Sequence, residues 1–323
     1  MTDIAIFFTK YVRHILSHYV IKCIERHASR KENLTMSVFT NQATLSYNNV
    51  TTTSNVTVGE IVQAISATKT ATPNVYGPGN TVVTFVVTLI NSGTEDVNGL
   101  TLTDDLGAYT PLSEGSGELV PLTYMEGTLL YYINGVLQAT PTVTGTSPLT
   151  ITGINVPADG SATVVYQTVT NEYADKAPGS TITSTTTVAG AELFTSVEVG
   201  ETISVNENAM LTISKSLSPT SVVENGTVTY TFVINNYGNT AITATDDAVV
   251  TDTFTPALTN LAATFNGAPW TAGNQYTYDA ATGAFATAAG QITVPAATVV
   301  QDETTGAVTV IPGSATLVVT GTV

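Results

Sequence analysis

Two repeats run through this chain, and they do not end at the same place. The first covers residues 67–205 and, after a strand-like segment at 160–165, adds an apparent hairpin at 180–199. The second repeat begins at Ile213 and stops directly after the matching strand-like segment, with no hairpin behind it. A β-sandwich that lacks its last strands exposes its core and leaves unpaired sheet edges. The second repeat is therefore expected to need strands from elsewhere.

The missing strands have a counterpart at the front of the chain. Residues 39–61 (FTNQATLSYNNVTTTSNVTVGEI) are similar to the closing hairpin of the first repeat at 182–202 (ITSTTTVAGAELFTSVEVGET). A hairpin donated by another copy of the chain would complete the second repeat, and successive donations make a fibre. We call residues 39–61 the donor hairpin. Its expected contact residues are Phe39, Asn41, Ala43, Leu45, Tyr47, Val56, Val58 and Ile61.

The organisation predicted from these repeats is all-β. We expect an N-terminal extension at 1–35 and a donor hairpin within 36–66. A first immunoglobulin-like domain follows at 67–205, and a second, without its closing hairpin, at 206–323. Short Thr- and Val-rich strands separated by Asn/Gly turns favour tandem immunoglobulin-like sandwiches. Asn134-Gly135 is one such signal, typical of a tight hairpin turn.

Charge divides the chain into two parts. Six of the nine Lys and Arg residues and all three histidines lie in the first 35 residues, together with the single cysteine. From Met36 onward the only basic residues are Lys69, Lys176 and Lys215, against all but three of the chain's 25 acidic residues. Such an acidic body repels nucleic acid and anionic membranes, so neither is expected as a partner. Without disulfides, it needs no oxidising compartment to fold.

Residues 1–35 allow two interpretations. Arg30-Lys31-Glu32 can be encoded by a bacterial ribosome-binding sequence a short distance before Met36, which favours translation from Met36. The alternative is an amphipathic helix, because apolar residues between Val12 and Ile24 recur at helical spacing among basic ones. Such a helix suits a membrane surface better than a membrane span.

The repeats share a detailed pattern. Each carries a Lys, then a Pro and a Gly, then a strand that ends in Asn-x-Gly, at 81–93 and 227–238. A second alternating strand follows in each and ends at Asp104 or Asp252. The strand, the Asn and the following Gly therefore correspond between the two repeats.

This pattern resembles the bacterial conserved repeat domain, also called domain of unknown function 11, an immunoglobulin-like module of surface proteins. The resemblance covers most of 36–323, twice. In that family an Asn-x-Ala-Thr-Val hairpin closes the domain, whereas here the matching segment at 41–45 stands in front. Short two-repeat members in spore-forming bacteria resemble structural proteins of spore appendages. The resemblance thus implies an extracellular fibre protein of the spore surface or cell surface.

Lys69 and Lys215 occupy equivalent positions in a chain with few lysines. One interpretation is an ion pair with the strand-end acids, Lys69 with Asp104 and Lys215 with Asp252. The other is an isopeptide bond, in which Lys215 attacks Asn41 of a donated hairpin while Asp252 handles the protons. Ser184, at the equivalent position of the first repeat, cannot accept such an attack.

Other chemistry has little support. Asp104-Asp105 and Asp246-Asp247 are weak calcium candidates, because clustered carboxylates in loops bind calcium, but no complete calcium-loop motif is present. From Met36 onward the chain has no His, Cys or Arg, which excludes a Ser-His-Asp triad and His-based metal sites there. We expect no enzymatic activity and no cofactor.

The sequence favours a structural subunit that polymerises head-to-tail with copies of itself, with other spore-surface or cell-surface proteins as further candidate partners. The alternative is a monomeric cell-surface adhesin or spacer module, in which the front hairpin packs within its own chain. Size in solution separates the two hypotheses.

Overall fold

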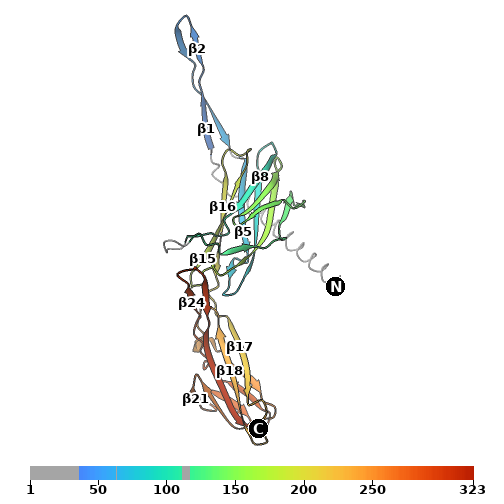
Figure 1. Cartoon of the computed structure of the whole chain (residues 1–323), viewed down its shortest axis with the longest axis vertical. Coiled ribbons are helices and arrows are strands. Elements are labelled where there is room, and N and C mark those ends of the chain that lie inside the picture. The colour runs from blue at the N-terminus through green and yellow to red at the C-terminus, as the bar shows by residue number, and fades with distance from the viewer. Residues whose placement is uncertain (1–35, 63, 111–116) are drawn as a thin grey trace. The chain divides into compact units, whose positions relative to one another are not determined.

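The computed structural model describes residues 36–62, 64–110 and 117–323 (Figure 1). Contacts divide the chain into one unit that ends at Gln63 and a second from Ala64 to Val323. The described residues are strands and turns, with one short 3-10 helix, η2 (Ala244–Asp246). The predicted all-β fold of tandem sandwiches is confirmed. The two interpretations of 1–35 lie outside the described residues.

The first unit contains a long two-part hairpin. Its strands are β1 (Met36–Asn41), β2 (Thr44–Tyr47), β3 (Val50–Thr53) and β4 (Thr57–Val62). β1 pairs with β4 and β2 pairs with β3, both antiparallel. The turn residues Asn48 and Asn49 both have positive φ, which suits the twist of a tight hairpin. Asn41 pairs with Thr57 but Thr44 pairs with Thr53, so a bulge separates the two parts.

The first domain is a sandwich of two sheets. Its strands are β5 (Ile65–Thr72), β6 (Val75–Tyr76), β7 (Val82–Asn91), β8 (Val97–Asp104), β9 (Leu122–Tyr124), β10 (Leu130–Ile133), β11 (Val136–Leu137), β12 (Thr142–Thr146), β13 (Leu149–Val156), β14 (Ser161–Thr170), β15 (Thr181–Ala189) and β16 (Val197–Val205). One sheet has the order β11-β10-β14-β7-β5, with β9 also paired to β14. The other has the order β12-β13-β8-β15-β16-β6.

Alternation of side chains forms the core of this first domain. β7 buries every second residue from Val83 to Asn91, and β15 does the same from Ile182 to Val188. This period of two places one face of each strand against the opposite sheet. Ile65, the first residue of β5, is buried in the same core. Asn134 and Gly135 both have positive φ between β10 and β11, which confirms the predicted tight turn.

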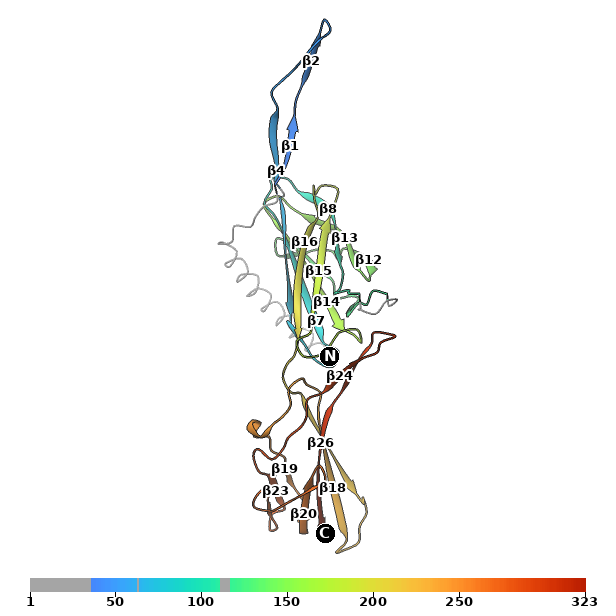
Figure 2. The same cartoon turned by 90° about the vertical axis from the view of Figure 1, so that its left-hand side faces the viewer.

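The second domain repeats only part of this arrangement (Figure 2). Its strands are β17 (Leu211–Ser218), β18 (Thr227–Asn236), β19 (Thr251–Thr253), β20 (Thr259–Phe265), β21 (Ala268–Trp270), β22 (Tyr276–Asp279), β23 (Ala284–Thr287), β24 (Thr298–Gln301), β25 (Val308–Ile311) and β26 (Gly313–Thr322). One sheet has the order β17-β18-β26-β20-β21 and the other β19-β23-β22, while β24 and β25 form a separate hairpin. This domain has its own core, which shares no buried residue with the first.

The Asn-x-Gly motif forms the same turn in both domains. Asn91 accepts a hydrogen bond from the Gly93 amide at 2.9 Å, and Asn236 accepts one from the Gly238 amide at 3.0 Å. Each Asn amide also donates to the backbone across the sandwich, at Val156 or Pro295. The repeats found in the sequence are therefore structural repeats, and positions can be compared between the two domains.

Candidate functional site

The first domain buries a lysine between its two sheets. Lys69 lies on β5 of one sheet, and its ammonium donates to Asp104 Oδ2 on β8 of the other at 2.7 Å. Lys69 also donates to Ser184 on β15, to Oγ at 2.7 Å and to the backbone oxygen at 2.9 Å. The side chains of Lys69 and Asp104 are fully shielded from solvent. We call Lys69, Asp104 and Ser184 the closed cluster.

Further donors surround the carboxylate of the closed cluster. Ser184 Oγ donates to Asp104 Oδ1 at 2.6 Å, and the Leu106 amide donates to the same oxygen at 2.8 Å. Thr186 Oγ1 donates to Oδ2 at 3.0 Å, and the Tyr166 hydroxyl also donates to Oδ2. A buried carboxylate is tolerated only when its oxygens are satisfied in this way.

Burial and pairing oppose one another in this cluster. Loss of water lowers the pKa of Lys69 below its ordinary value, and the nearby Asp104 reverses only part of that effect. Burial by itself would raise the pKa of Asp104, but the Lys69 ammonium and the hydroxyl donors outweigh it, so this pKa lies below its ordinary value. Burial and the adjacent Asp104 charge raise the pKa of Tyr166, which stays a hydrogen-bond donor.

The second domain has the same lysine and acid, but without cover. Lys215 on β17 is paired with Asp252 on β19, and their side chains are 40% and 18% exposed. Three aromatic rings approach the ammonium, with centroids at 4.7 Å for Tyr230, 5.4 Å for Phe232 and 5.2 Å for Phe254. We call Lys215 and Asp252 the open cluster. The expected ion pairs are thus present in both domains, in opposite surroundings.

The open cluster is exposed because no strand in the described part of the chain covers it. In the first domain, β15 and β16 pair beside β8 and place Ser184 over Lys69. Among the described residues, nothing joins the three-stranded sheet of the second domain in the places that β15, β16 and β6 take in the first. Every residue of β17 is exposed, including Leu211, Ile213 and Leu217 at alternate positions around Lys215. We call these three residues and Lys215 the β17 stripe.

The sheet that carries Asp252 also has a free edge in the described structure. In the first domain β8 pairs with β13 on one side and with β15 on the other, where Thr186 lies opposite Asp104. In the second domain β19 pairs only with β23 in the described part of the chain. Unpaired strand edges beside exposed apolar residues form a template for added strands.

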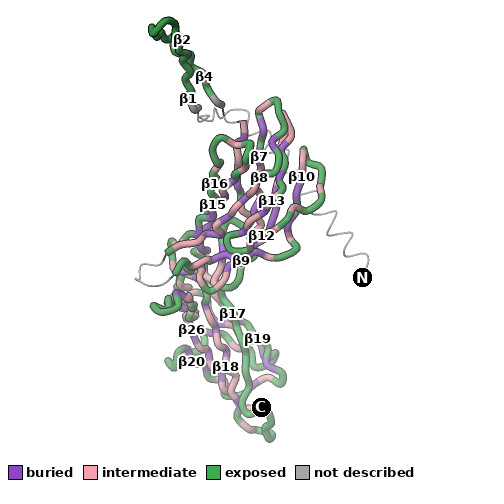
Figure 3. The backbone as a smooth tube through the Cα atoms, turned by 45° about the horizontal axis from the view of Figure 1, so that its top comes forward, coloured by how far each residue is buried: buried purple, intermediate pink, exposed green. Residues whose placement is uncertain are grey.

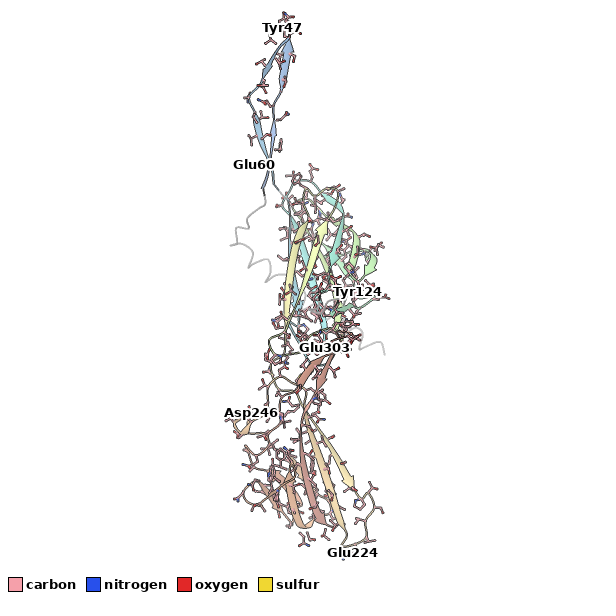
Figure 4. The ribbon with its side chains drawn as sticks, turned by 60° about the vertical axis from the view of Figure 1, so that its left-hand side comes forward. Tyr47, Glu60, Tyr124, Glu224, Asp246 and Glu303 are labelled. Atoms are coloured by element: carbon pink, nitrogen blue, oxygen red, sulfur yellow. The ribbon has the colours of Figure 1, made fainter. Side chains whose placement is uncertain are left out.

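The donor hairpin is exposed from Phe39 to Val58. Phe39, Leu45, Tyr47, Val56 and Val58 are all more than half exposed, and Asn41 and Ala43 are exposed as well (Figure 3). Tyr47 marks the tip of this hairpin (Figure 4), and Ile61 lies near the end of β4. Monomeric proteins seldom expose so many large apolar side chains together, so the hairpin is a surface suited to burial against a partner.

Three of the four aspartates considered for calcium accept hydrogen bonds within the protein. Asp104 belongs to the closed cluster, and Asp105 Oδ1 accepts from the amides of Gly107 and Thr185, each at 2.8 Å. Asp246 accepts from the Thr243 amide at the start of η2, and Asp247 follows that helix. The described residues contain no group of three or more His, Cys, Asp or Glu side chains arranged to hold a metal ion. Within the same residues, no helix has the length and apolar character to span a membrane.

Sequence reasoning missed Tyr166 and Thr186. Both donate to Asp104, but they lie on β14 and β15, far from it along the chain. A signal was available for Tyr166, because Val319 occupies the equivalent position of the second repeat. The two repeats match along this strand except that one has a tyrosine where the other has a valine. The difference indicates that only the first domain needs a hydroxyl group at this position.

No family model and no curated protein matches the chain. Among solved structures, it is similar to the pilus backbone protein RrgB of Streptococcus pneumoniae, with 12% identity, 77% of this chain and 55% of that one covered, and a TM-score of 0.28. It is also similar to BcpA, the major pilin subunit of Bacillus cereus, with 11% identity, coverages of 85% and 73%, and a TM-score of 0.31. A third similar structure is AvmM, a macrocyclization catalyst in alchivemycin A biosynthesis, with 13% identity, coverages of 51% and 96%, and a TM-score of 0.26. TM-scores this low give no basis for transferring a function from any of the three.

Proposed function

We propose that this protein is a structural subunit that assembles head-to-tail into a fibre. One observation carries the proposal. No described strand covers Lys215 as β15 covers Lys69, while the hairpin at 39–61, which is similar in sequence to the β15–β16 hairpin, is exposed. The donor hairpin of one subunit enters the second domain of the next. Because donor and acceptor lie in different parts of the chain, each added subunit offers a new acceptor and the assembly does not close.

The first domain, in which β15 covers the lysine, shows the geometry of the proposed contact. There, alternate residues of β15 from Ile182 to Val188 face the core, and Val188 lies opposite Leu102 of β8. Aligned on the same positions, Phe39, Asn41, Ala43 and Leu45 present one face of the donor hairpin. Backbone pairing along β19 then supplies affinity, and the alternate side chains fix the register.

Burial of the donor explains why such a contact would last. Leaving the acceptor would expose Leu45 and Phe39 on one side and the β17 stripe on the other, together with unpaired backbone along β19. Unpaired backbone groups and exposed apolar side chains both raise the free energy of the separated state. Slow dissociation suits a fibre with a mechanical role.

We place this fibre outside the cell, on a spore surface or cell surface, and we expect no catalytic role. The repeat motif of bacterial surface proteins supports the location. The acidic body, which has three lysines and no arginine or histidine from Met36 onward, disfavours nucleic acid and anionic membranes as partners. Other surface proteins are candidate partners at the fibre ends.

Negative-stain electron microscopy of purified Met36–Val323, beside the same chain without 36–62, tests the proposal. Fibres from the first protein and single particles from the second are expected. Addition of the isolated 36–62 peptide in excess is expected to cap the acceptor and shorten the fibres. Monodisperse monomers from both proteins would overturn the proposal and favour the adhesin or spacer hypothesis instead.

A further inference from the structure

We propose that fibre contacts become covalent through an isopeptide bond between Lys215 of one subunit and Asn41 of the donor hairpin of the next. This inference rests on the proposed function, because the two side chains meet only when the donor hairpin occupies the second domain. It adds a chemical modification site that a non-covalent fibre does not require.

The closed cluster shows what lies over the lysine in a completed domain. Ser184 Oγ is 2.7 Å from the Lys69 ammonium and 2.6 Å from Asp104 Oδ1, so the side chain at this position touches both partners. Aligning the donor hairpin with the closing hairpin of the first domain puts Asn41 at the position of Ser184. In a completed second domain, the Asn41 carboxamide therefore lies between Lys215 and Asp252.

The three groups have the chemistry that an amide exchange needs. The Lys215 amine attacks Cγ of Asn41, a new C–N bond forms, and the bond from Cγ to the amide nitrogen breaks to release ammonia. Asp252 takes a proton from the attacking amine and passes it to the leaving nitrogen, so no other reactant is consumed. Its Oδ1 is held by the Thr253 amide at 2.9 Å, and Oδ2 faces the lysine.

Closure of the domain supplies the remaining condition. An amine attacks only when it is neutral, and burial in the first domain lowers the pKa of Lys69 in just this position. Tyr230, Phe232 and Phe254 already surround the Lys215 ammonium on the inner side. The donor hairpin would cover the solvent side and complete a site without water.

The first domain is an internal control for this chemistry. Its lysine is buried and paired with an acid, as the reaction requires, but the side chain of Ser184 has no carboxamide to attack. The chain thus keeps the lysine and acid in both domains and places a carboxamide only in the hairpin that leaves its own subunit. A bond confined to the contact between subunits strengthens the fibre without linking one chain to itself.

Boiling in detergent, followed by gel electrophoresis and mass spectrometry, tests the inference. Wild-type fibres are expected to give a ladder of covalent multimers, with a Lys215–Asn41 peptide that has lost one ammonia. K215R and N41S are expected to form fibres visible by electron microscopy but no ladder. N55S, in the same hairpin and outside its strands, is expected to keep the ladder.

The outcomes separate the two proposals. Wild-type fibres that dissolve completely into monomers on boiling would overturn the covalent bond and leave the donor-hairpin fibre intact. A ladder that persists in N41S would equally overturn the assignment to Asn41. Wild-type protein that never assembles would overturn the donor-hairpin fibre first. If a variant fails to assemble, mixing it with wild-type protein and searching for the linked peptide by mass spectrometry decides whether that residue takes part.

Discussion

Lys69 and Lys215 provide a matched pair for measuring what the closing strands contribute. Replacing either by Met removes the ammonium and keeps most of the apolar stem. In K69M, Asp104 loses its only cationic partner within a fully buried site, and the backbone oxygen of Ser184 loses a donor. In K215M, the same change occurs where the lysine side chain is 40% exposed and water replaces the lost contacts.

The burial of each ion pair determines how much unfolding free energy each substitution removes. Removing one partner of a buried ion pair costs about 3–5 kcal/mol. The hydroxyls of Ser184, Thr186 and Tyr166 still donate to Asp104, which favours the lower end, about 3 kcal/mol. An exposed pair contributes only about 0–1 kcal/mol, and the partial exposure of Lys215 puts K215M in that range.

Urea unfolding of Ala64–Val323, a compact unit without the donor hairpin, measures both values. With a denaturant slope of roughly 2 kcal/mol per molar, K69M is expected to lower the midpoint of the first domain by about 1.5 M. Trp270, the only tryptophan, lies on β21 of the second domain and is stacked on Phe265 at 5.0 Å. Its fluorescence therefore follows the second domain, and circular dichroism follows both.

Equal midpoint shifts for K69M and K215M would refute this reasoning, since the two positions would then have the same environment. A double variant checks the physical cause. K69M/D104N leaves no net charge in the closed cluster, so it is expected to be more stable than K69M alone by about 1–2 kcal/mol. A double variant less stable than K69M would mean that lost packing, rather than an unpaired charge, causes the effect.

Three further predictions concern acid, the donor face and a turn. As pH falls below the ordinary Asp pKa of 3.8, Asp104 stays ionised in the folded state while the unfolded chain takes up a proton. The first domain is therefore expected to lose stability from about pH 4 downward. In D104N, the urea midpoint is expected to depend less steeply on pH. L45A removes about 2 kcal/mol of burial at the subunit contact and should raise the critical concentration for fibre growth roughly 30-fold, with S46A on the opposite face as the control, both measured by light scattering. Gly283 and Gly267 both have a left-handed backbone, but a Cβ added at Gly283 would clash with the backbone oxygen of Phe254, whereas one added at Gly267 would meet open space. G267A is expected to cost roughly 1–2 kcal/mol of stability, and G283A well beyond that. Trp270 fluorescence follows the unfolding of the second domain in both variants.

Much of the fold was predictable because the two repeats share one pattern of strands and turns, and each supports the interpretation of the other. The strand pairs around Asn91 and Asn236, the ion pairs at Lys69 and Lys215, and the tight turn at Asn134 all follow from local patterns. Alternating β-branched residues indicate strands, and Asn-Gly indicates the turn type, without any knowledge of distant contacts.

What the sequence did not reveal depends on contacts between distant strands. The hydroxyl of Tyr166 reaches Asp104 across the sandwich, and nothing near either residue indicates the other. The bulge in the donor hairpin, where 54–56 lie opposite 42–43, is similar, because it appears only as a change of register between paired strands. Ile65 belongs to the first core although it precedes the recognisable repeat, since strand pairing with Asn91 extends beyond the shared motif.

The two domains also differ in the composition of the face that carries the lysine. Along β5 the residues beside Lys69 are Ala67 and Ala71, which the closing strands cover. At the equivalent positions β17 carries Ile213 and Leu217, which are larger and are 57% and 37% exposed. A face that is merely left open favours polar or small residues, because exposed apolar groups promote non-specific association. The β17 stripe is instead more apolar than the corresponding face of β5, which is the composition expected of a surface that becomes buried under added strands, as the proposed fibre contact requires.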